Sequence, residues 1–322
     1  MTILRVPPEV AGQRLDVFVQ SQLKRTSRTR AQAIVRASAY DGDGRKLVPN
    51  DRVRPEQTVL LWRAAWDETP VPTVVPVLYE DEHLLAVDKP AMLPVHPTAR
   101  YHKNTLIKVL QGERPEIPFL SLGHRLDRET SGVMLVTKSR ACDRALKKQL
   151  EARLDVEKTY AAMTWGVPDR GDGARSFRYE RGVTLDEASA LRVKMRTSDA
   201  PGALHAATVF EVVETRTGGA GTYALVRCTL ETGRQHQIRL HLASLGAPVV
   251  GDKLYGPDER AFARAADGEL TEEDSRRLEL PRHALHSAQL ALRHPMTGAR
   301  LVVEAPLPED MRAFWESLAP SA

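Results

Sequence analysis

The 322-residue sequence has little cysteine and no long apolar run. Its two cysteines, Cys142 and Cys228, lie far apart and form no CxxC pair, which argues against a disulfide framework and against a zinc knuckle. No stretch approaches the ~18 uncharged apolar residues of a membrane span, and Met1–Val10 lacks the apolar core of a signal peptide. These absences favour a cytoplasmic protein in which both cysteines are buried as small hydrophobic side chains.

The rest of the composition is that of a globular protein. Apolar residues make up 42% and charged residues 27% of the chain, a balance that excludes a wholly disordered chain, a collagen and a coiled coil. The sequence contains no internal repeat and no low-complexity segment. Because domains usually have roughly 100–200 residues, we expect two parts in this chain, a catalytic domain and a smaller domain attached to it.

Positive charge is concentrated at the amino-terminal end of the chain. The net charge is +4, but residues 1–63 hold 12 lysines and arginines against 6 acidic residues, a balance of +6, and the remainder balances at −2. A compact basic module suits a polyanion, since neutralised phosphates supply most non-specific affinity for nucleic acids. A solvated basic surface without a partner is the alternative that charge alone leaves open.

The apolar spacing in residues 1–63 predicts two helices followed by two strands. The first helix covers residues 13–24, and the second begins at Ser27, whose hydroxyl can cap it. A turn at 41–44 and a strand at 58–62 complete the module. The helices carry an arginine-bearing side, so the candidate nucleic-acid contacts are Arg14, Arg25, Arg28 and Arg36.

Three prolines in residues 66–76 favour an extended linker, which we place at 64–76, so that the larger domain covers 77–322. Residues 166–182 read as a polar, glycine-rich excursion and 257–283 as a charged helical insertion at the surface. The mixture of elements predicts an α+β domain, with helices at 139–153 and 234–245 and strands at 77–79, 84–88, 132–137, 156–164, 204–213, 223–231 and 285–292.

The densest group of polar residues in this domain is the segment GHRLDRETSG at 123–132. Asp127 lies between Arg125 and Arg128, and a positive charge within a few ångströms lowers the pKa of a carboxylate by roughly 1–3 units. A carboxylate held ionised in this way could act as a nucleophile or a base. The alternative is that Asp127 only caps a turn onto the next strand through Thr130 or Ser131.

This segment resembles the H-R-L-D-x-x-T-S-G signature of the RluA-type pseudouridine synthases. The resemblance covers about residues 75–305, because further sequence blocks of the family occur in the same order and with the same spacing. These blocks are 77–97, 158–160, 232–241, 251–256, His286 and His294-Pro295. Within the first block, Met92 replaces the usual glycine. It implies an α+β fold with a mixed, largely antiparallel central sheet and flanking helices. It also implies isomerisation of uridine to pseudouridine in RNA without a cofactor or a metal.

The resemblance assigns roles to individual residues. Asp127 would be the nucleophile or base, and Arg239 would form the salt bridge that keeps it ionised. Tyr160 would stack on the target uracil and could assist proton transfer, because a phenol has both a π-face and a polar tip. Arg125 would fill the space left by the flipped uridine, and Ile238 would pack beside the base.

The remaining substrate-binding candidates are His124, Thr130, Lys89 and His96. Lys89 could touch a phosphate or extend along the end of a strand, and the histidines, including His286, could instead hold loops by hydrogen bonds. His236 and His241 lack an HExxH pattern and a third ligand, so we expect no metal site.

Residues 13–62 are similar to the small RNA-binding domain of a ribosomal small-subunit protein, here called S-four-like. Arg14-Leu15-Asp16 and Ser27-Arg28 stand where that domain has its RLD and SR, while Tyr40–Lys46 replaces its V-N-G turn. The implied partner is structured RNA, and the appended domain favours large-subunit ribosomal RNA over transfer RNA (tRNA). A monomer is the simplest expectation.

Two other functions are open to a sequence of this kind. The first is a non-catalytic RNA-binding or ribosome-assembly protein that retains the fold, but binding alone does not require a carboxylate such as Asp127 beside anionic RNA. The second is a glycoside hydrolase that uses Asp127 with Glu129. Residues two apart project to opposite faces of a strand, which argues against that acid pair.

Overall fold

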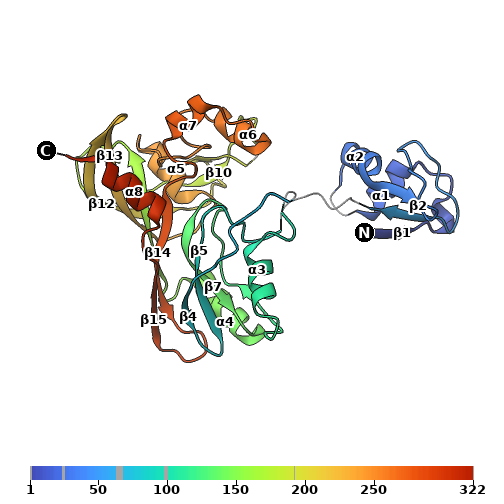
Figure 1. Ribbon diagram of the computed structural model, residues 1–322, viewed down its shortest axis with the longest axis horizontal. Coiled ribbons are helices and arrows are strands. Elements are labelled where there is room, and N and C mark those ends of the chain that lie inside the picture. The colour runs from blue at the N-terminus through green and yellow to red at the C-terminus, as the bar shows by residue number, and fades with distance from the viewer. Residues whose placement is uncertain (1, 24–25, 63–67, 98–100, 192, 322) are drawn as a thin grey trace. The chain divides into compact units, whose positions relative to one another are not determined.

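The structure is a computed structural model that describes residues 2–23, 26–62, 68–97, 101–191 and 193–321. The chain divides into two compact units, Met1–Asp67 and Glu68–Ala322 (Figure 1). The boundary falls inside the segment expected to be a linker. From Glu68 to Pro76 the chain has no helix or strand, but Val75 is buried in the core of the second unit. This part of the expected linker therefore packs as part of the larger unit.

The first unit packs two helices on a three-stranded antiparallel sheet. The helices expected from the apolar spacing are present, and the Ser27 hydroxyl caps the second of them by accepting a hydrogen bond from the Arg30 backbone N–H. The strand at the start of the chain was not expected. The elements are β1 (Thr2–Arg5), a 3-10 turn (Pro8–Val10), α1 (Leu15–Gln22), α2 (Arg28–Ser38), β2 (Ala39–Asp41) and β3 (Thr58–Leu61), with sheet order β1-β3-β2.

The second unit is built on an eleven-stranded sheet, which confirms the expected α+β class. Its order is β16-β12-β13-β8-β14-β7-β5-β4, with β15, β6 and β9 attached at the sides, and β10 and β11 form a separate pair. The strands are β4 (Val77–Glu80), β5 (Leu84–Lys89), β6 (Ser121–Leu122), β7 (Ser131–Thr137), β8 (Glu157–Trp165), β9 (Ser176–Glu180), β10 (Val183–Leu185), β11 (Met195–Thr197), β12 (Ala207–Gly218), β13 (Gly221–Leu230), β14 (Leu285–Arg293), β15 (Arg300–Glu304) and β16 (Ala319–Pro320).

The second unit also contains helices. They are α3 (Leu106–Glu113), α4 (Arg140–Ala152), α5 (Gln237–Ser244), α6 (Arg260–Asp267), α7 (Glu272–Leu278) and α8 (Glu309–Ser317). Figure 1 shows α6 and α7 gathered together, which agrees with the helical insertion expected at 257–283. Among the described residues, no helix combines the length and the apolar character that crossing a lipid bilayer requires.

Strand β7 carries alternate side chains into two separate hydrophobic clusters. Met134 packs in the cluster that includes the helix α3, while Leu135 packs in the cluster that includes Cys142 and Leu146 of α4. This alternation follows from the two faces of a strand. Cys142 and Cys228 are both free and buried, as expected.

One parallel contact joins the two halves of the sheet, because β14 and β7 pair in parallel through His286 with Ser131 and Ser287 with Gly132. The other pairs are antiparallel, which matches the mixed, largely antiparallel sheet. Gly132 has a φ of +106°, and a Cβ there would lie 2.2 Å from the Ser287 carbonyl oxygen. The last glycine of the signature is therefore required by the close approach of β14.

One local expectation was wrong. Residues 166–182, read as a polar excursion, contain the strand β9, which pairs with β12 along Ser176–Glu180. The strand alternates buried and exposed residues, with Phe177 packed against Phe210. Only the apolar side chains of β9 face the core, and the polar residues around them made this segment look like a loop in the sequence.

Candidate active site

Asp127, Arg239 and Asp252 form one ion cluster in the second unit, with Arg239 paired to both carboxylates. The Arg239 guanidinium donates two hydrogen bonds to the Asp252 carboxylate, at 2.6 Å from Nε and 2.7 Å from Nη2. Its remaining Nη1 donates to Asp127 Oδ2 at 2.8 Å. One cation therefore serves two carboxylates, and Asp252 fixes the orientation in which Arg239 reaches Asp127.

The two carboxylates differ in their access to solvent. The side chain of Asp252 is completely buried, that of Arg239 is 7% exposed, and that of Asp127 is 35% exposed. Asp252 also accepts the backbone N–H groups of Leu254 and Tyr255, so its Oδ1 is fully used. Within the described part of the chain, Asp127 Oδ1 accepts no hydrogen bond. Asp127 is thus the member of the cluster that can meet another molecule.

Local backbone geometry brings Asp252 against Arg239. Helix α5 begins just after His236, which has a φ of +57°, and Arg239 lies in its first turn. Gly251, immediately before Asp252, has a φ of +76°, and a Cβ there would lie 2.0 Å from the Arg282 carbonyl oxygen. The Gly-Asp pair of the sequence is therefore a tight turn that delivers the carboxylate to α5.

The electrostatics of this cluster favour an ionised Asp127. Burial raises the pKa of the Asp127 carboxyl, but the charge of Arg239 and its hydrogen bond outweigh burial and hold the pKa below its usual value. Burial lowers the pKa of Arg239, and the two carboxylates more than reverse this, so the guanidinium stays charged. The carboxylate remains available as a base or nucleophile across the neutral pH range.

Tyr160 lies in β8, between β13 and β14, where its register partners are Cys228 and Ser287. Its side chain is almost completely buried and packs in the same cluster as Ile238. Burial raises the pKa of Tyr160 to about 12, so the phenol is protonated near neutral pH. The side chain can present a ring face and donate a proton, but it is not a ready base.

The residues that follow Asp127 fasten the loop to its surroundings. The Thr130 hydroxyl bonds His283 Nε2 at 2.8 Å, and the Ser131 hydroxyl bonds His286 Nδ1 at 2.9 Å. Burial lowers the pKa of His283 to about 3 and that of His286 to about 4, so both rings are neutral partners. The loop that carries Asp127 is therefore anchored to the strand β14 and the segment before it.

Glu129 is committed to structure and forms no acid pair with Asp127. Both of its oxygens accept from Lys253 Nζ, at 3.1 and 3.0 Å, and Oε2 also accepts the His283 backbone N–H at 3.1 Å. Burial raises the pKa of Glu129, but the charge and hydrogen bonds of Lys253 and the charge of Arg239 bring it below the usual value. A carboxylate tied in this way is not the proton donor that a glycoside hydrolase needs.

Two expected substrate contacts lie too deep for that role. Lys89 is completely buried, and its ammonium donates to the carbonyl oxygens of Pro90, Leu93 and Arg128 at 2.8, 3.0 and 3.1 Å. Thr130 is also buried and engaged with His283. Both residues hold the loop in place. Because the three N–H donors of the Lys89 ammonium are already occupied, Lys89 has this structural role in place of the expected contact with a phosphate.

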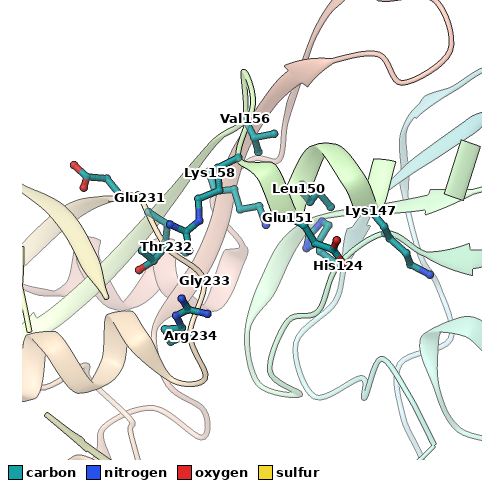
Figure 2. A pocket seen from close by; sticks show the side chains of 13 residues that line it. His124, Lys147, Leu150, Glu151, Val156, Lys158, Glu231, Thr232, Gly233 and Arg234 are labelled. Carbon is teal, nitrogen blue, oxygen red and sulfur yellow. The ribbon is translucent and has the colours of Figure 1, made fainter. Parts of the chain in front are cut away.

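The other expected substrate contacts differ in their exposure. Arg125 and His96 are exposed, whereas Ile238 is buried in the core cluster that also contains Tyr160. His124 accepts a hydrogen bond from the Leu135 backbone at 3.2 Å, and its Nδ1 is buried without a partner. Figure 2 shows His124 on the wall of a pocket that also contains Lys158.

In the first unit, a buried carboxylate organises the expected arginines. Asp16 accepts two hydrogen bonds of 2.9 Å from Arg14, one of 3.4 Å from Arg28 and one of 2.7 Å from Gln32. The Arg14 hydrogen bonds hold the pKa of Asp16 well below its usual range, against burial. Arg36 is exposed on α2, and Arg25 lies outside the described residues.

Reasoning from the sequence missed the roles of Asp252, Lys253 and His283. The resemblance included Gly251-Asp252 as a motif but gave the aspartate no partner. A buried arginine shared by two carboxylates cannot be read from spacing, because its partners lie 13 and 112 residues away. In the described part of the chain, no group of three or more His, Cys, Asp or Glu residues is placed to hold a metal ion.

Comparison with known proteins identifies this architecture as that of an RNA-modifying isomerase. Residues 83–244 match the family model described as RNA pseudouridylate synthase. The fold resembles human RNA pseudouridylate synthase domain containing 1, with a TM-score of 0.59 and 22% identity over 79% of this chain and 92% of that one. It also resembles human RNA pseudouridylate synthase domain containing 4, with a TM-score of 0.56 and 25% identity over 75% of this chain and 92% of that one.

Several curated relatives match almost the whole chain. The ribosomal large subunit pseudouridine synthase D of Xanthomonas campestris is 34% identical over 97% of this chain and 91% of its own length. The enzyme of the same name from Pseudomonas aeruginosa is 36% identical over 95% of this chain and 92% of its own length. Ribosomal large subunit pseudouridine synthase C of Escherichia coli is 32% identical, over 98% and 96%. The chain therefore belongs to the RNA pseudouridine synthase family, and the expected isomerase is confirmed.

Proposed function

We propose that this enzyme converts specific uridines of large-subunit ribosomal RNA to pseudouridine, with Asp127 as the reacting carboxylate. The observation that carries the proposal is the partly exposed Asp127, which Arg239 holds ionised and whose Oδ1 accepts no hydrogen bond from the described residues. The substrate is supported by the curated relatives, whose names specify the ribosomal large subunit over almost the full length of this chain.

The reaction needs a carboxylate of this kind. Pseudouridine formation breaks the bond between uracil N1 and ribose C1′, turns the base and joins C5 to C1′. C5 loses its proton to solvent, and N1 gains one. An ionised Asp127 can attack C1′ or remove a proton from the sugar, and both routes require the pKa that Arg239 maintains.

The surroundings of Asp127 suit the other steps. The protonated Tyr160 presents an aromatic ring beside the site, and Ile238 adds an apolar surface in the same cluster. A stacked uridine must leave its helix or loop before Asp127 can reach its sugar, which costs a few kcal/mol. Arg125 is exposed two residues before Asp127, so its guanidinium is available to fill the vacated space and offset part of that cost.

Arg125 gives a specific test of base flipping. The variant Arg125→Ala should lower kcat/KM about tenfold or more on base-paired RNA and much less on a single-stranded RNA, in which little unstacking is needed. Arg128→Ala is a control because Arg128 lies in the same loop but contacts Glu129 and Tyr101. An equal loss on both RNAs would show that Arg125 has no part in extruding the base.

The cellular substrate is tested by mapping pseudouridine in total RNA from cells that lack the gene. We expect a ribosomal large-subunit position to lose its pseudouridine and to regain it with the wild-type gene but not with Asp127→Asn. Asp43→Asn, an exposed residue of the first unit, should restore it fully. Loss only from transfer RNA would identify tRNA as the substrate and overturn the ribosomal assignment.

A further inference from the structure

A basic pocket is lined by residues that are close in the sequence to Asp127, Tyr160 and Arg239. It has a volume of about 500 Å³, and its lining does not include Asp127, Tyr160 or Arg239. Its walls come from four places: the start of the signature loop, the last turns of α4, the first half of β8 and the connection from β13 to α5. Figure 2 shows Lys158 between Thr232 on one wall and Leu150 on the other.

The pocket contains a lysine that lacks an acidic partner in the described part of the chain. Lys158 is partly buried, and burial alone lowers the pKa of its ammonium. The two glutamates of the lining do not neutralise it: Glu231 is hydrogen-bonded to Arg178 at 2.9 and 3.0 Å, and Glu151 is exposed. A partly buried charge without a counter-ion costs folding free energy, and an anionic ligand would offset that cost.

Other groups add donors to the same space. Arg153 and Arg234 line it. Among the described residues, the Arg234 side chain donates only through Nε, at 2.9 Å from the His205 carbonyl oxygen, so its terminal nitrogens remain available. The buried His124 Nδ1 likewise has no hydrogen-bond partner in the part of the chain that the structure describes. Lys147 is the exception, because Asp143 neutralises it at 2.8 Å. The pocket therefore has a surplus of hydrogen-bond donors and positive charge, which suits phosphate oxygens.

The pocket is next to the reacting carboxylate because its residues belong to the same segments of the chain as the site residues. Lys158 precedes Tyr160 by two residues on β8, so both side chains lie on one face of the strand, roughly 6.5–7 Å apart along it. His124 precedes Asp127 by three residues in the signature loop. Arg234 precedes the helix that carries Arg239.

We propose that this pocket binds a phosphodiester of the RNA strand next to the flipped uridine, with Lys158 as its main contact and Arg153 and Arg234 at its edges. The inference rests on the proposed function, because it assumes that RNA enters beside Asp127. It adds a specificity role: the pocket fixes the path of the RNA strand next to Asp127, so that one uridine of an RNA loop is positioned over this carboxylate.

The test uses Lys158→Gln in the full-length protein, with Lys148→Gln as the matched control. Lys148 is exposed on α4, outside the pocket. The probe is a stem–loop RNA that contains the uridine identified by mapping, bound to variants that also carry Asp127→Asn so that no turnover occurs. We expect Lys158→Gln to weaken binding about tenfold. The slope of log K against log salt should become smaller by about 0.7–0.9, the value for one phosphate contact.

A change in the RNA separates a phosphate contact from a structural effect. Replacing single phosphodiesters around the uridine by uncharged methylphosphonates should weaken wild-type binding about tenfold at one linkage, and that linkage should have no further effect with Lys158→Gln. The melting temperature of Lys158→Gln should equal or exceed that of the wild type, because an unpaired, partly buried charge has been removed.

The possible outcomes are distinct. Binding and salt slope equal to those of Lys148→Gln would overturn the proposal. Weaker binding with an unchanged slope and no coupling to any linkage would also overturn it, because it would mean that Lys158 only supports the fold. If the wild-type enzyme isomerises no uridine at all, the proposed function fails. The same comparison of Lys158→Gln with Lys148→Gln, made on the inert background with whole large-subunit ribosomal RNA, then still decides through the salt slope whether Lys158 contacts a phosphate.

Discussion

At the residue scale, the site depends on one arginine divided between two carboxylates of unequal exposure. Asp252 is completely buried and takes the bidentate face of Arg239, which leaves a single Nη1 for Asp127. The bidentate pair requires the planar fork of a guanidinium, which a lysine does not have. Asp252 therefore acts on the reaction through Arg239, as a positioning residue.

Replacing this arginine should change the pH dependence of the reaction. In Arg239→Lys the ammonium cannot hold both carboxylates in the same geometry, and the pKa of Asp127 should rise because burial is then less well opposed. Since the ionised form reacts, the acid limb of kcat/KM should move to higher pH, and the loss of activity should be greater at pH 5.5 than at pH 8. Tritium release from RNA that contains 5-tritiated uridine, measured across pH, gives both values.

The matched control is Arg227→Lys, whose arginine pairs with Glu211 on the exposed face of the sheet. Its profile should equal that of the wild type. An Arg239→Lys variant with a lower rate but an unshifted acid limb would contradict the claim that Arg239 sets the ionisation of Asp127.

The ion pair between Asp252 and Arg239 also affects how the stability of the protein changes at acid pH. Burial raises the pKa of its carboxyl, but Arg239 lowers it to far below the usual 3.8. A carboxyl with a lowered pKa in the folded state contributes stability that is present above its ordinary pKa and lost as the pH falls through its folded pKa. The contribution of the Asp252 carboxylate to the free energy of unfolding should therefore be constant between pH 5 and 7.

Below about pH 4, the ordinary value for an unfolded aspartate, unfolding should become progressively easier. Urea unfolding of wild type and Asp252→Asn at several pH values tests this. The difference between them should be a few kcal/mol near neutral pH and should shrink below pH 4. A difference that stays constant down to pH 3 would contradict the cited direction of the shift.

At the element scale, the parallel contact between β7 and β14 determines where the catalytic loop lies. Gly132 and Ser131 meet Ser287 and His286 in register, directly after the loop that carries Asp127. The close approach at Gly132 leaves no room for a side chain. The small residues of the T-S-G triplet thus fix the loop against β14.

A single methyl group should disturb this contact. In Gly132→Ala the new Cβ would lie 2.2 Å from the Ser287 carbonyl oxygen at a φ of +106°, and we expect a loss of about 2–4 kcal/mol in the free energy of unfolding. Gly112→Ala is the comparison, because that glycine lies in α3 with open space around it, and it should be neutral or stabilising by up to ~1 kcal/mol. Urea denaturation would contradict the account if the two variants had equal midpoints.

The elements that could be predicted from sequence are those whose side chains alternate or repeat clearly. Helix α4 follows its Ser139 cap and its apolar stripe, and the seven strands expected in the larger domain correspond to β4, β5, β7, β8, β12, β13 and β14. Helix α3 was missed because it has only eight residues, lacks a side-chain cap and contains Gly112. Its stability comes from Leu106 and Leu110 in the core, which is a tertiary effect.

The candidate site divides in the same way. The signature around Asp127 and the Arg239 partner could be predicted by resemblance, but the shared geometry with Asp252 could not, because it depends on the turn at Gly251. The roles of Lys89 and Thr130 could not be read from sequence either, since their partners include residues 39 and 153 positions away. Charge and residue type place a side chain near the chemistry, whereas burial decides what it can touch.

At the scale of the whole molecule, charge and catalysis belong to different units. The amino-terminal unit holds the surplus of positive charge, and the site residues Asp127, Tyr160, Arg239 and Asp252 all lie in the second unit. The acidic insertion of the second unit is partly neutralised from within, because Arg264 pairs with Asp258 and Asp274. We propose that the first unit supplies RNA affinity and the second supplies the reaction.

Removing the first unit tests this division. A protein that begins at Glu68 should bind ribosomal RNA more weakly and with a smaller salt slope, because several phosphate contacts are lost. At saturating RNA its kcat should stay within about twofold of the full chain. The double variant Arg28→Gln/Arg36→Gln, which changes two exposed arginines of α2, should show part of the same loss. An unchanged salt slope in both would mean that the first unit does not bind RNA.

The central claim is that an Asp127 carboxylate, kept ionised by Arg239, isomerises a uridine of large-subunit ribosomal RNA. The most direct measurement is single-turnover tritium release from 5-tritiated large-subunit RNA taken from cells that lack the gene. We predict release by the wild type and by Asp43→Asn, and none by Asp127→Asn although it binds the RNA equally well. Release by Asp127→Asn at a rate near that of the wild type would contradict the account.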